Sequence, residues 1–246
     1  MKAVILLVCM GGVAFAVYWF GLRSGCGTAG AIDCPAPELE EGIGVTLKSA
    51  DVCPRAGYLC KGAKVYYGGK NLRIARWPLD KGRLRLRVTL PEFLDENSGP
   101  RVRAATIEGI KVWDGHPFPI TFDTGAFTVR FWDISVVWTK GLTSGALGQS
   151  GLNWNWNAER KRPELSSTVL AIGVPSDGRT DPDSLALVKA VATHEMGHAL
   201  GLLHSDRKND IMFPMLDGDP KKLRASARDF RTVDSLYKLP NGATIK

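Results

Sequence analysis

The spacing of apolar residues changes from a strand-like to a helical period between residues 84 and 113. Leu84, Leu86 and Val88 alternate with arginines, which predicts a half-buried strand with a basic outer face. Ser98-Gly99-Pro100 then favours a helix start, because proline suits the first turn. Four residues at helical spacing give this helix a core face: Val102, Thr106, Ile110 and Trp113. We therefore expect a strand followed by a helix.

More strands and a long helix are expected in the middle of the chain. Val129 and Phe131, with their apolar neighbours, predict one strand, and Thr168–Val174 predicts another. Asp181-Pro182-Asp183 is typical of a helix start, since it combines an N-cap, a proline at the first position and an acid favoured by the helix dipole. From Leu185 this helix is apolar nearly all round, which predicts a buried central helix.

A last helix is expected near the C-terminus. Ser226-Ala227-Arg228-Asp229 can cap it, and its buried stripe consists of Phe230, Val233, Leu236 and Tyr237. Strands mixed with three helices in this order predict an α+β domain.

The first residues are interpreted as a targeting signal over residues 1–22. Residues 3–20 are almost wholly apolar and follow Lys2. Ala14-Phe15-Ala16 supplies an A-x-A pattern, which favours a cleaved secretion signal. The apolar run also continues to the length of a membrane span, so a retained single-pass anchor is the alternative. Either interpretation predicts a protein that is secreted or held in the cell envelope.

Residues 23–64 are rich in glycine, proline and cysteine and lack periodicity, which predicts an N-terminal extension before a globular domain over residues 65–246. Four cysteines lie in this extension: Cys26, Cys34, Cys53 and Cys60. In an exported chain they imply disulfides, with three connectivities open. We favour the two local loops, Cys26–Cys34 and Cys53–Cys60.

Three of the four histidines fall within residues 194–204, in the spacing H-E-x-x-H-x-x-G-x-x-H. On a helix, His194 and His198 project from one face. Gly201 lets the chain leave the helix with positive φ, which brings His204 back towards them. Three imidazoles arranged in this way predict one catalytic zinc with an open fourth position. Glu195 is then the candidate general base rather than a ligand.

A methionine follows the histidines in Asn209-Asp210-Ile211-Met212-Phe213-Pro214. Together the two motifs resemble the metzincin metalloproteases, whose zinc motif precedes a tight turn with a methionine beneath the metal. Met212 matches that methionine. Ser205 after the third histidine and the Ile-Met-Phe-Pro run look most like the matrixin branch, and we expect a bacterial-type secreted member.

The resemblance implies both the fold and the activity. It implies a twisted, mostly parallel five-stranded sheet with an antiparallel edge strand, a long active-site helix, a Met-turn and a C-terminal helix. Arg76-Trp77-Pro78-Leu79 resembles the opening strand of these catalytic domains. The implied activity is zinc-dependent hydrolysis of peptide bonds in proteins or peptides, with Glu195 activating a water molecule.

The same resemblance assigns further residues. Pro214, Met215 and Leu216 would form a wall of the pocket for the residue after the cleaved bond, with Leu216 in place of the usual tyrosine and an apolar side chain as the expected occupant. Asp229 matches an acid that braces the Met-turn. Arg228 replaces the adjacent acid that pairs with a freed N-terminus, so activation by that salt bridge is not expected. The family's cysteine latency motif is also absent.

Calcium is the second metal that the resemblance suggests. Five acids lie in loops that could bind it: Asp177, Asp181, Asp183, Asp217 and Asp219. None of them forms a complete recognisable calcium loop.

The formal net charge of +7 leaves the partners partly open. Scattered basic residues usually form a solvated face, but they could also attract anionic substrates or a membrane or cell surface. No nucleic-acid motif is present, and we expect a monomer without nucleic-acid partners. Trp154 and Trp156 could stack on sugars or pack against the protein.

Two other functions compete with the protease. One is a zinc-containing envelope module that binds anionic polymer or polysaccharide without proteolysis. The other is a metal-binding structural protein, which the open fourth ligand position argues against. Because Glu195 is intact, the sequence favours the enzyme.

Overall fold

The computed structural model describes residues 45–61, 72–74, 76–125, 132–140, 146–158, 162–175, 178–216 and 218–246. The predicted targeting segment, the strand expected at Val129 and Phe131, and the boundary at residue 65 lie outside these residues. Among the described residues, no helix has the length and apolar character to span a membrane.

A five-stranded sheet forms the base of the structure. Its strands are β3 (Leu84–Arg87), β4 (Ile120–Asp123), β5 (Ile134–Thr139), β6 (Gly148–Asn157) and β7 (Arg162–Gly173), arranged in the order β4-β3-β5-β7-β6. Neighbouring strands from β4 to β7 run parallel, and β6 pairs antiparallel with β7 at the edge. The predicted mostly parallel sheet with one antiparallel edge strand is confirmed.

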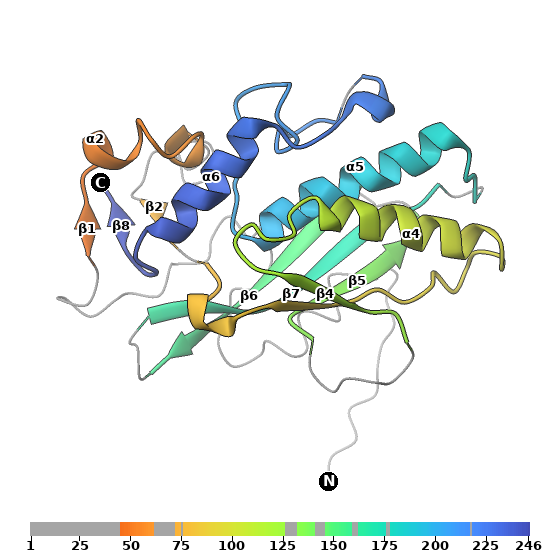
Figure 1. Cartoon of the computed structure of the whole chain (residues 1–246), viewed down its shortest axis with the longest axis horizontal. Helices are drawn as coiled ribbons and strands as arrows, with labels where there is room; N and C mark the ends of the chain where they lie inside the picture. Colours follow the sequence, from red (N-terminus) through yellow and green to blue (C-terminus); the bar gives the residue numbers. More distant parts are fainter. Residues whose placement is uncertain are drawn as a thin grey trace, which may run out of the picture.

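Two helices, α4 (Ser98–Lys111) and α5 (Pro182–Ala199), cover one face of this sheet (Figure 1). The core face predicted for α4 is confirmed, since Val102, Thr106 and Ile110 are fully buried. Gly109 lets α4 approach α5 closely, because a Cβ atom at this position would lie 2.3 Å from the carbonyl oxygen of Lys189. The two helices therefore pack backbone against backbone at this point.

Helix α5 is fixed at both ends. At its start, the Asp181 carboxylate accepts hydrogen bonds from the backbone amides of Asp183 and Ser184 at 3.0 and 3.1 Å, as predicted for the N-cap. At its end, the Trp77 indole donates to the carbonyl of Ala199 at 2.8 Å, and the Tyr237 hydroxyl donates to that of Leu200 at 3.0 Å. Terminal helix carbonyls lack partners within the helix. Buried aromatic donors satisfy them here.

The predicted strand at Arg76–Leu79 is wrong. Residues 76–78 adopt no regular structure, and Leu79–Lys81 forms a 3-10 turn, η1. Pro78 has no N–H to donate to a neighbouring strand. The Trp77 side chain is instead buried beneath the end of α5, so the segment supports the helix and does not extend the sheet.

A second, small sheet joins the ends of the described chain. Its order is β1 (Thr46–Leu47), β8 (Thr244–Ile245) and β2 (Leu72–Arg73). After β1 come the short helix α2 (Ser49–Val52) and a loop closed by a Cys53–Cys60 disulfide. The Cys53–Cys60 pairing is therefore present, whereas Cys26–Cys34 lies outside the described residues. These elements lie beside the C-terminal helix (Figure 1).

The C-terminal helix α6 (Ala227–Lys238) begins at a capping box. The Ser226 hydroxyl accepts from the amide of Asp229, and the Asp229 carboxylate accepts from the amide of Ser226. Val233, Leu236 and Tyr237 are buried, and Phe230 packs partly against the core. The predicted closing helix is confirmed. A 3-10 turn, η2 (Pro220–Lys222), precedes it.

We predict that Gly109→Ala lowers the free energy of unfolding by about 2 kcal/mol, because the added methyl group must separate α4 from α5. Gly99→Ala in the same helix is the matched control. Beyond its chain neighbours and its own helix, its Cβ would meet no atom closer than 3.8 Å. Pro100 follows directly and disfavours the helical conformation for a residue with a Cβ, so a small loss of stability is expected, well below that of Gly109→Ala. Urea unfolding measures both, and equal midpoints for the two variants would contradict this packing.

Candidate metal centre

Three imidazoles converge at the C-terminal end of α5. His194 and His198 lie one turn apart on the helix, and His204 lies on the loop that follows. The Nε2 atom of His198 is 3.1 Å from that of His194 and 3.2 Å from that of His204. Nitrogen ligands of one tetrahedral zinc ion lie about 3.3 Å apart. These two distances therefore match those between the ligands of one metal ion, and the three ligand nitrogens all lie within 4.8 Å of one another.

The helix ends in a conformation that returns His204 to this site. Gly201 has a φ of 98°. The Gly201 amide donates to the carbonyl of His198 at 2.8 Å, and the Leu202 amide donates to that of Gly197 at 3.0 Å. This pair of bonds is the Schellman motif, which requires a residue with positive φ. The turn predicted from Gly201 is confirmed.

The surroundings of the histidines suit metal ligands. The Nδ1 atom of His194 lies 2.7 Å from the carbonyl oxygen of Ile211, and that of His198 lies 2.8 Å from the carbonyl oxygen of Leu202. An Nδ1–H that donates to a carbonyl leaves the Nε2 lone pair free for a metal. Burial lowers the pKa of all three imidazoles, that of His204 to about 4. The neutral form that binds metal is therefore favoured, and the residues fit a zinc ion.

Glu195 is buried beside the metal centre. Desolvation raises the pKa of its carboxyl to about 7, against a lowering effect of the Ser150 hydroxyl. The Ser150 Oγ atom lies 2.8 Å from both the Oε2 atom and the backbone oxygen of Glu195. Strand β6 approaches the carboxyl closely at Gly148, where a Cβ atom would lie 2.7 Å from Oε1. A carboxyl with a pKa near neutrality can both accept and return a proton.

The Met-turn, residues 209–214, lies beneath the histidines. Met212 is fully buried, and the absence of a side chain at Gly197 makes room for it, because a Cβ there would lie 2.3 Å from the Met212 sulfur. The Ser205 amide donates to the carbonyl of Met212 at 2.7 Å. This bond ties the turn to the residue that follows His204.

Asp229 connects α6 to the Met-turn. It is fully buried, and its Oδ2 atom accepts from the amide of Ile211 at 3.0 Å. Its neighbour Arg228 donates to Asp206 at 2.6 Å and to Asp210 at 2.7 Å. Arg228, which stands where the resemblance implies an acid, thus forms two ion pairs on the loop between His204 and Met212.

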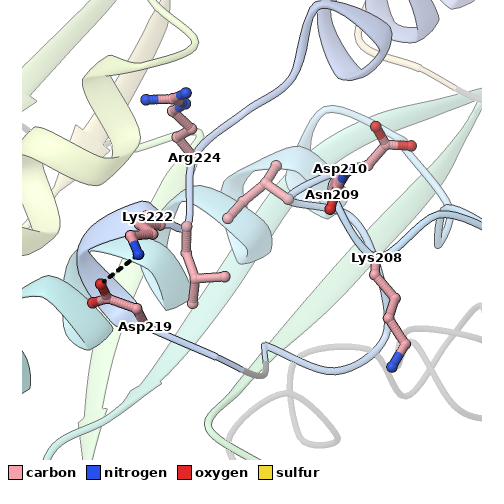
Figure 2. A pocket seen from close by; sticks show the side chains of 8 residues that line it. Lys208, Asn209, Asp210, Asp219, Lys222 and Arg224 are labelled. Atoms are coloured by element: carbon pink, nitrogen blue, oxygen red, sulfur yellow. Dashed lines mark ion pairs between the residues drawn. The ribbon is translucent and has the colours of Figure 1, made fainter.

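A pocket of about 360 Å³ lies next to the Met-turn (Figure 2). It is lined by Lys208, Asn209, Asp210, Ile211, Asp219, Lys222, Leu223 and Arg224. The residues predicted to form the substrate wall do not line this pocket. Pro214 and Met215 are exposed, and Leu216 packs partly against the core. Their role as a wall stays a prediction.

Three of the five acids considered for calcium have other partners. Asp181 caps α5, Asp183 pairs with Lys221 at 2.6 Å, and Asp219 pairs with Lys222 at 3.5 Å (Figure 2). Asp177 and Asp217 lie outside the described residues. Within the described part of the chain, the histidines form the one cluster that could hold a metal ion. Calcium binding stays a prediction.

Sequence reasoning missed several residues around the site. Ser150 and Gly148 lie in a stretch rich in glycine, serine and asparagine, where no motif distinguishes them. Tyr58, whose hydroxyl donates to Asp229 at 2.9 Å, lies in the N-terminal extension. The side chains of Trp154 and Trp156 lie outside the described part of the structure, so neither sugar stacking nor packing is tested.

The sequence matches the family model for matrixin over residues 95–238, more than half of the chain. It is 40% identical over 60 residues to matrilysin of Homo sapiens, covering 24% of this chain and 22% of that protein. It is 41% identical over 56 residues to metalloendoproteinase 5-MMP of Arabidopsis thaliana, covering 22% and 16%. It is 45% identical over 51 residues to macrophage metalloelastase of Rattus norvegicus, covering 20% and 11%.

These matches span less than a quarter of each relative's length. The relatives are animal and plant proteins, so the bacterial-type origin stays a prediction.

The raised pKa of Glu195 predicts how the stability of the zinc-free protein depends on pH. The pKa of this carboxyl is 4.5 in the unfolded chain and about 7 in the folded protein. Between pH 4.5 and about pH 7, the unfolded carboxyl therefore loses its proton while the folded one keeps it. The free energy of unfolding of the parent should therefore fall as pH rises through this interval, by roughly 3 kcal/mol from this group alone. The histidines, whose pKa values are lowered, act in the opposite direction.

Glu195→Gln isolates the contribution of the carboxyl, because the amide does not titrate. The stability of this variant relative to the parent should increase from pH 4.5 to 7, as measured by urea unfolding of chelator-treated protein. A constant difference across that range would show that the carboxyl is not desolvated.

Proposed function

Since the chain belongs to the matrixin family, we propose that it is a zinc-dependent endopeptidase that hydrolyses peptide bonds within proteins. One observation carries the proposal. Three converging, neutral imidazoles lie on and after one helix, and the buried Glu195 carboxyl follows the first of them directly. A structural zinc site would use all four ligand positions, whereas three histidines leave one open for catalysis.

His194, His198 and His204 would hold the metal through their Nε2 atoms. A zinc ion bound there supplies Lewis-acid chemistry, which acidifies water and polarises a peptide carbonyl. The carbonyls of Ile211 and Leu202 fix two of the imidazoles through Nδ1, so the ligand set is organised in advance. Met212 packs against Gly197 of α5, the helix that carries His194 and His198.

Glu195 would move the proton. Its carboxylate takes a proton from the attacking water and returns it to the leaving amine. The Ser150 hydroxyl engages Oε2, which leaves Oε1 as the oxygen that receives the proton. Gly148 keeps β6 close to this oxygen without covering it by a side chain. Ser150 and Gly148 thus orient the carboxylate.

Substrates are proteins or peptides. Pro214, Met215 and Leu216 remain our candidates for the wall of the pocket that receives the residue after the cleaved bond. The exposed Met215 side chain offers an apolar contact to it. The net charge of +7 supports attraction to anionic substrates or cell surfaces that weakens with added salt.

The proposed location is outside the cytosol. The Cys53–Cys60 disulfide supports export, because such bonds persist in oxidising compartments. We propose a secreted or envelope-held monomer, with residues 1–22 as a signal peptide or a single-pass anchor.

The protease proposal predicts that the purified protein cuts a peptide library and that Glu195→Ala lowers kcat about a thousandfold while still binding zinc. The variant loses the group that transfers the proton but keeps the three histidines, so kcat should fall while zinc is still bound. Glu108→Ala is the control, because Glu108 is an exposed glutamate on α4 that pairs with Lys189. It should cut like the parent.

Zinc bound at one ion per chain without any cleavage would contradict the proposal. Retention of such a protein on polysaccharide columns, equally for parent and Glu195→Ala, would then identify the binding module.

A further inference from the structure

The disulfide-closed part of the N-terminal extension packs on α6 and reaches the supports of the metal centre. Figure 1 shows α2 and the chain after it beside α6. The Tyr58 amide donates to the Thr232 hydroxyl at 3.3 Å, and the Ser235 hydroxyl donates to the carbonyl of Arg55 at 3.1 Å. Gly57, with a φ of 58°, lets the loop approach Thr232 closely. Residues 53–61 therefore pack against α6 at a defined position.

One route of hydrogen bonds leads from this segment to His194. The Tyr58 hydroxyl donates to Oδ1 of Asp229 at 2.9 Å, and Oδ2 of Asp229 accepts from the amide of Ile211 at 3.0 Å. The carbonyl of the same Ile211 lies 2.7 Å from Nδ1 of His194. Each step is a direct contact, so the tyrosine lies three hydrogen bonds from a metal ligand.

A second route leads to the residue after His204. The Arg228 guanidinium contacts Asp206 and Asp210 and also donates to the Ser205 hydroxyl at 3.1 Å. Its central carbon lies 5.1 Å from the centre of the Tyr58 ring. Lys61 pairs with the second carboxylate oxygen of Asp206, Oδ2, at 2.8 Å, whereas Arg228 contacts Oδ1. The first route begins at Tyr58 and the second at Arg228, and these two side chains are in contact with each other.

The loop between His204 and Met212 depends on these side chains for its shape. It contains neither helix nor strand, and its inward-facing acid Asp210 is buried. A buried carboxylate is stable only when charged or hydrogen-bonding partners surround it. Tyr58 is fully buried, and burial next to Asp229 raises its pKa well above the usual value, so it remains a donor.

We propose that residues 53–61 form a built-in strut for the metal centre, in which Tyr58 and Arg228 are positioning residues that hold His194 and His204 in the geometry for binding metal. The Cys53–Cys60 bond keeps Tyr58 at this position on α6. Tyr58 and Arg228 donate through their side chains and not through a freed N-terminus, so their contacts with the aspartates need no cleavage of the chain. The catalytic consequence rests on the proposed protease function, whereas the effect on metal binding does not.

The test compares the zinc affinity of full-length variants by competition with a chelator. Tyr58→Phe removes one hydroxyl and should weaken zinc binding about tenfold, as loss of a partner beyond the direct ligands commonly does. Arg228→Lys should weaken it similarly, because one ammonium group cannot reach both aspartates. Replacing both cysteines by serine should reproduce the effect of Tyr58→Phe.

Ser235→Ala is the matched control. It removes a hydrogen bond between the same segment and the same helix, but one that leads to neither route. Its zinc affinity should equal that of the parent. Circular dichroism and thermal unfolding establish that each variant is folded at the assay temperature, and Tyr58→Phe decides the question if Arg228→Lys does not fold.

Parental zinc affinity in Tyr58→Phe would overturn the strut. So would an equal loss of affinity in Ser235→Ala, because that loss would follow general stability. Where the parent cuts peptides, Tyr58→Phe at subsaturating zinc should lower kcat with little change in KM. A parent that binds zinc but cuts nothing would refute the protease alone, since the affinities still test the strut.

Discussion

The end of α5 must bring three imidazole nitrogens together as the ligands of one metal ion, all within 4.8 Å of one another, and much of the described structure supports that arrangement. The Nε2 atom of His198 lies 3.1 Å from that of His194 and 3.2 Å from that of His204, a spacing that a shared cation would make favourable. Buried hydrogen bonds hold the backbone at this point. Aromatic donors from Trp77 and Tyr237 fix the last helical carbonyls, and the Schellman turn at Gly201 fixes the direction of the loop.

The loop around the metal centre is held by buried polar side chains. Each of them would destabilise the fold if it had no hydrogen-bonding or charged partner. Asp229 is fully buried with three donors, from Tyr58, Ile211 and Ser226. Asp210 is paired with Arg228, and Glu195 accepts from Ser150. These polar contacts fix the direction of a loop without regular structure, which apolar contacts alone would specify less well. The buried polar network thus connects the supports of the metal centre to one another.

Local patterns explain what could be predicted. The His194–His198 spacing equals one helical turn, the N-caps at Asp181 and Ser226 act within three residues, and alternation of apolar residues predicted β3. The supports could not be predicted, because they join distant positions: Ser150 and Glu195 are 45 residues apart, and Tyr58 and Asp229 are 171 apart. The two-residue strands β1 and β8 carry no periodic signal. Arg76–Leu79 resembled a strand, but Trp77 is buried against α5 and the segment forms no ladder.

The most direct test of a metal centre made of three histidines and an open position is X-ray absorption spectroscopy of the purified zinc-bound protein. We expect one zinc ion per chain, three imidazole nitrogens and one light-atom ligand at about 2.0–2.1 Å, unchanged in Glu195→Gln. A sulfur neighbour at about 2.3 Å would contradict the account, because a cysteine would then occupy the position reserved for water. So would a fourth imidazole or the absence of bound zinc.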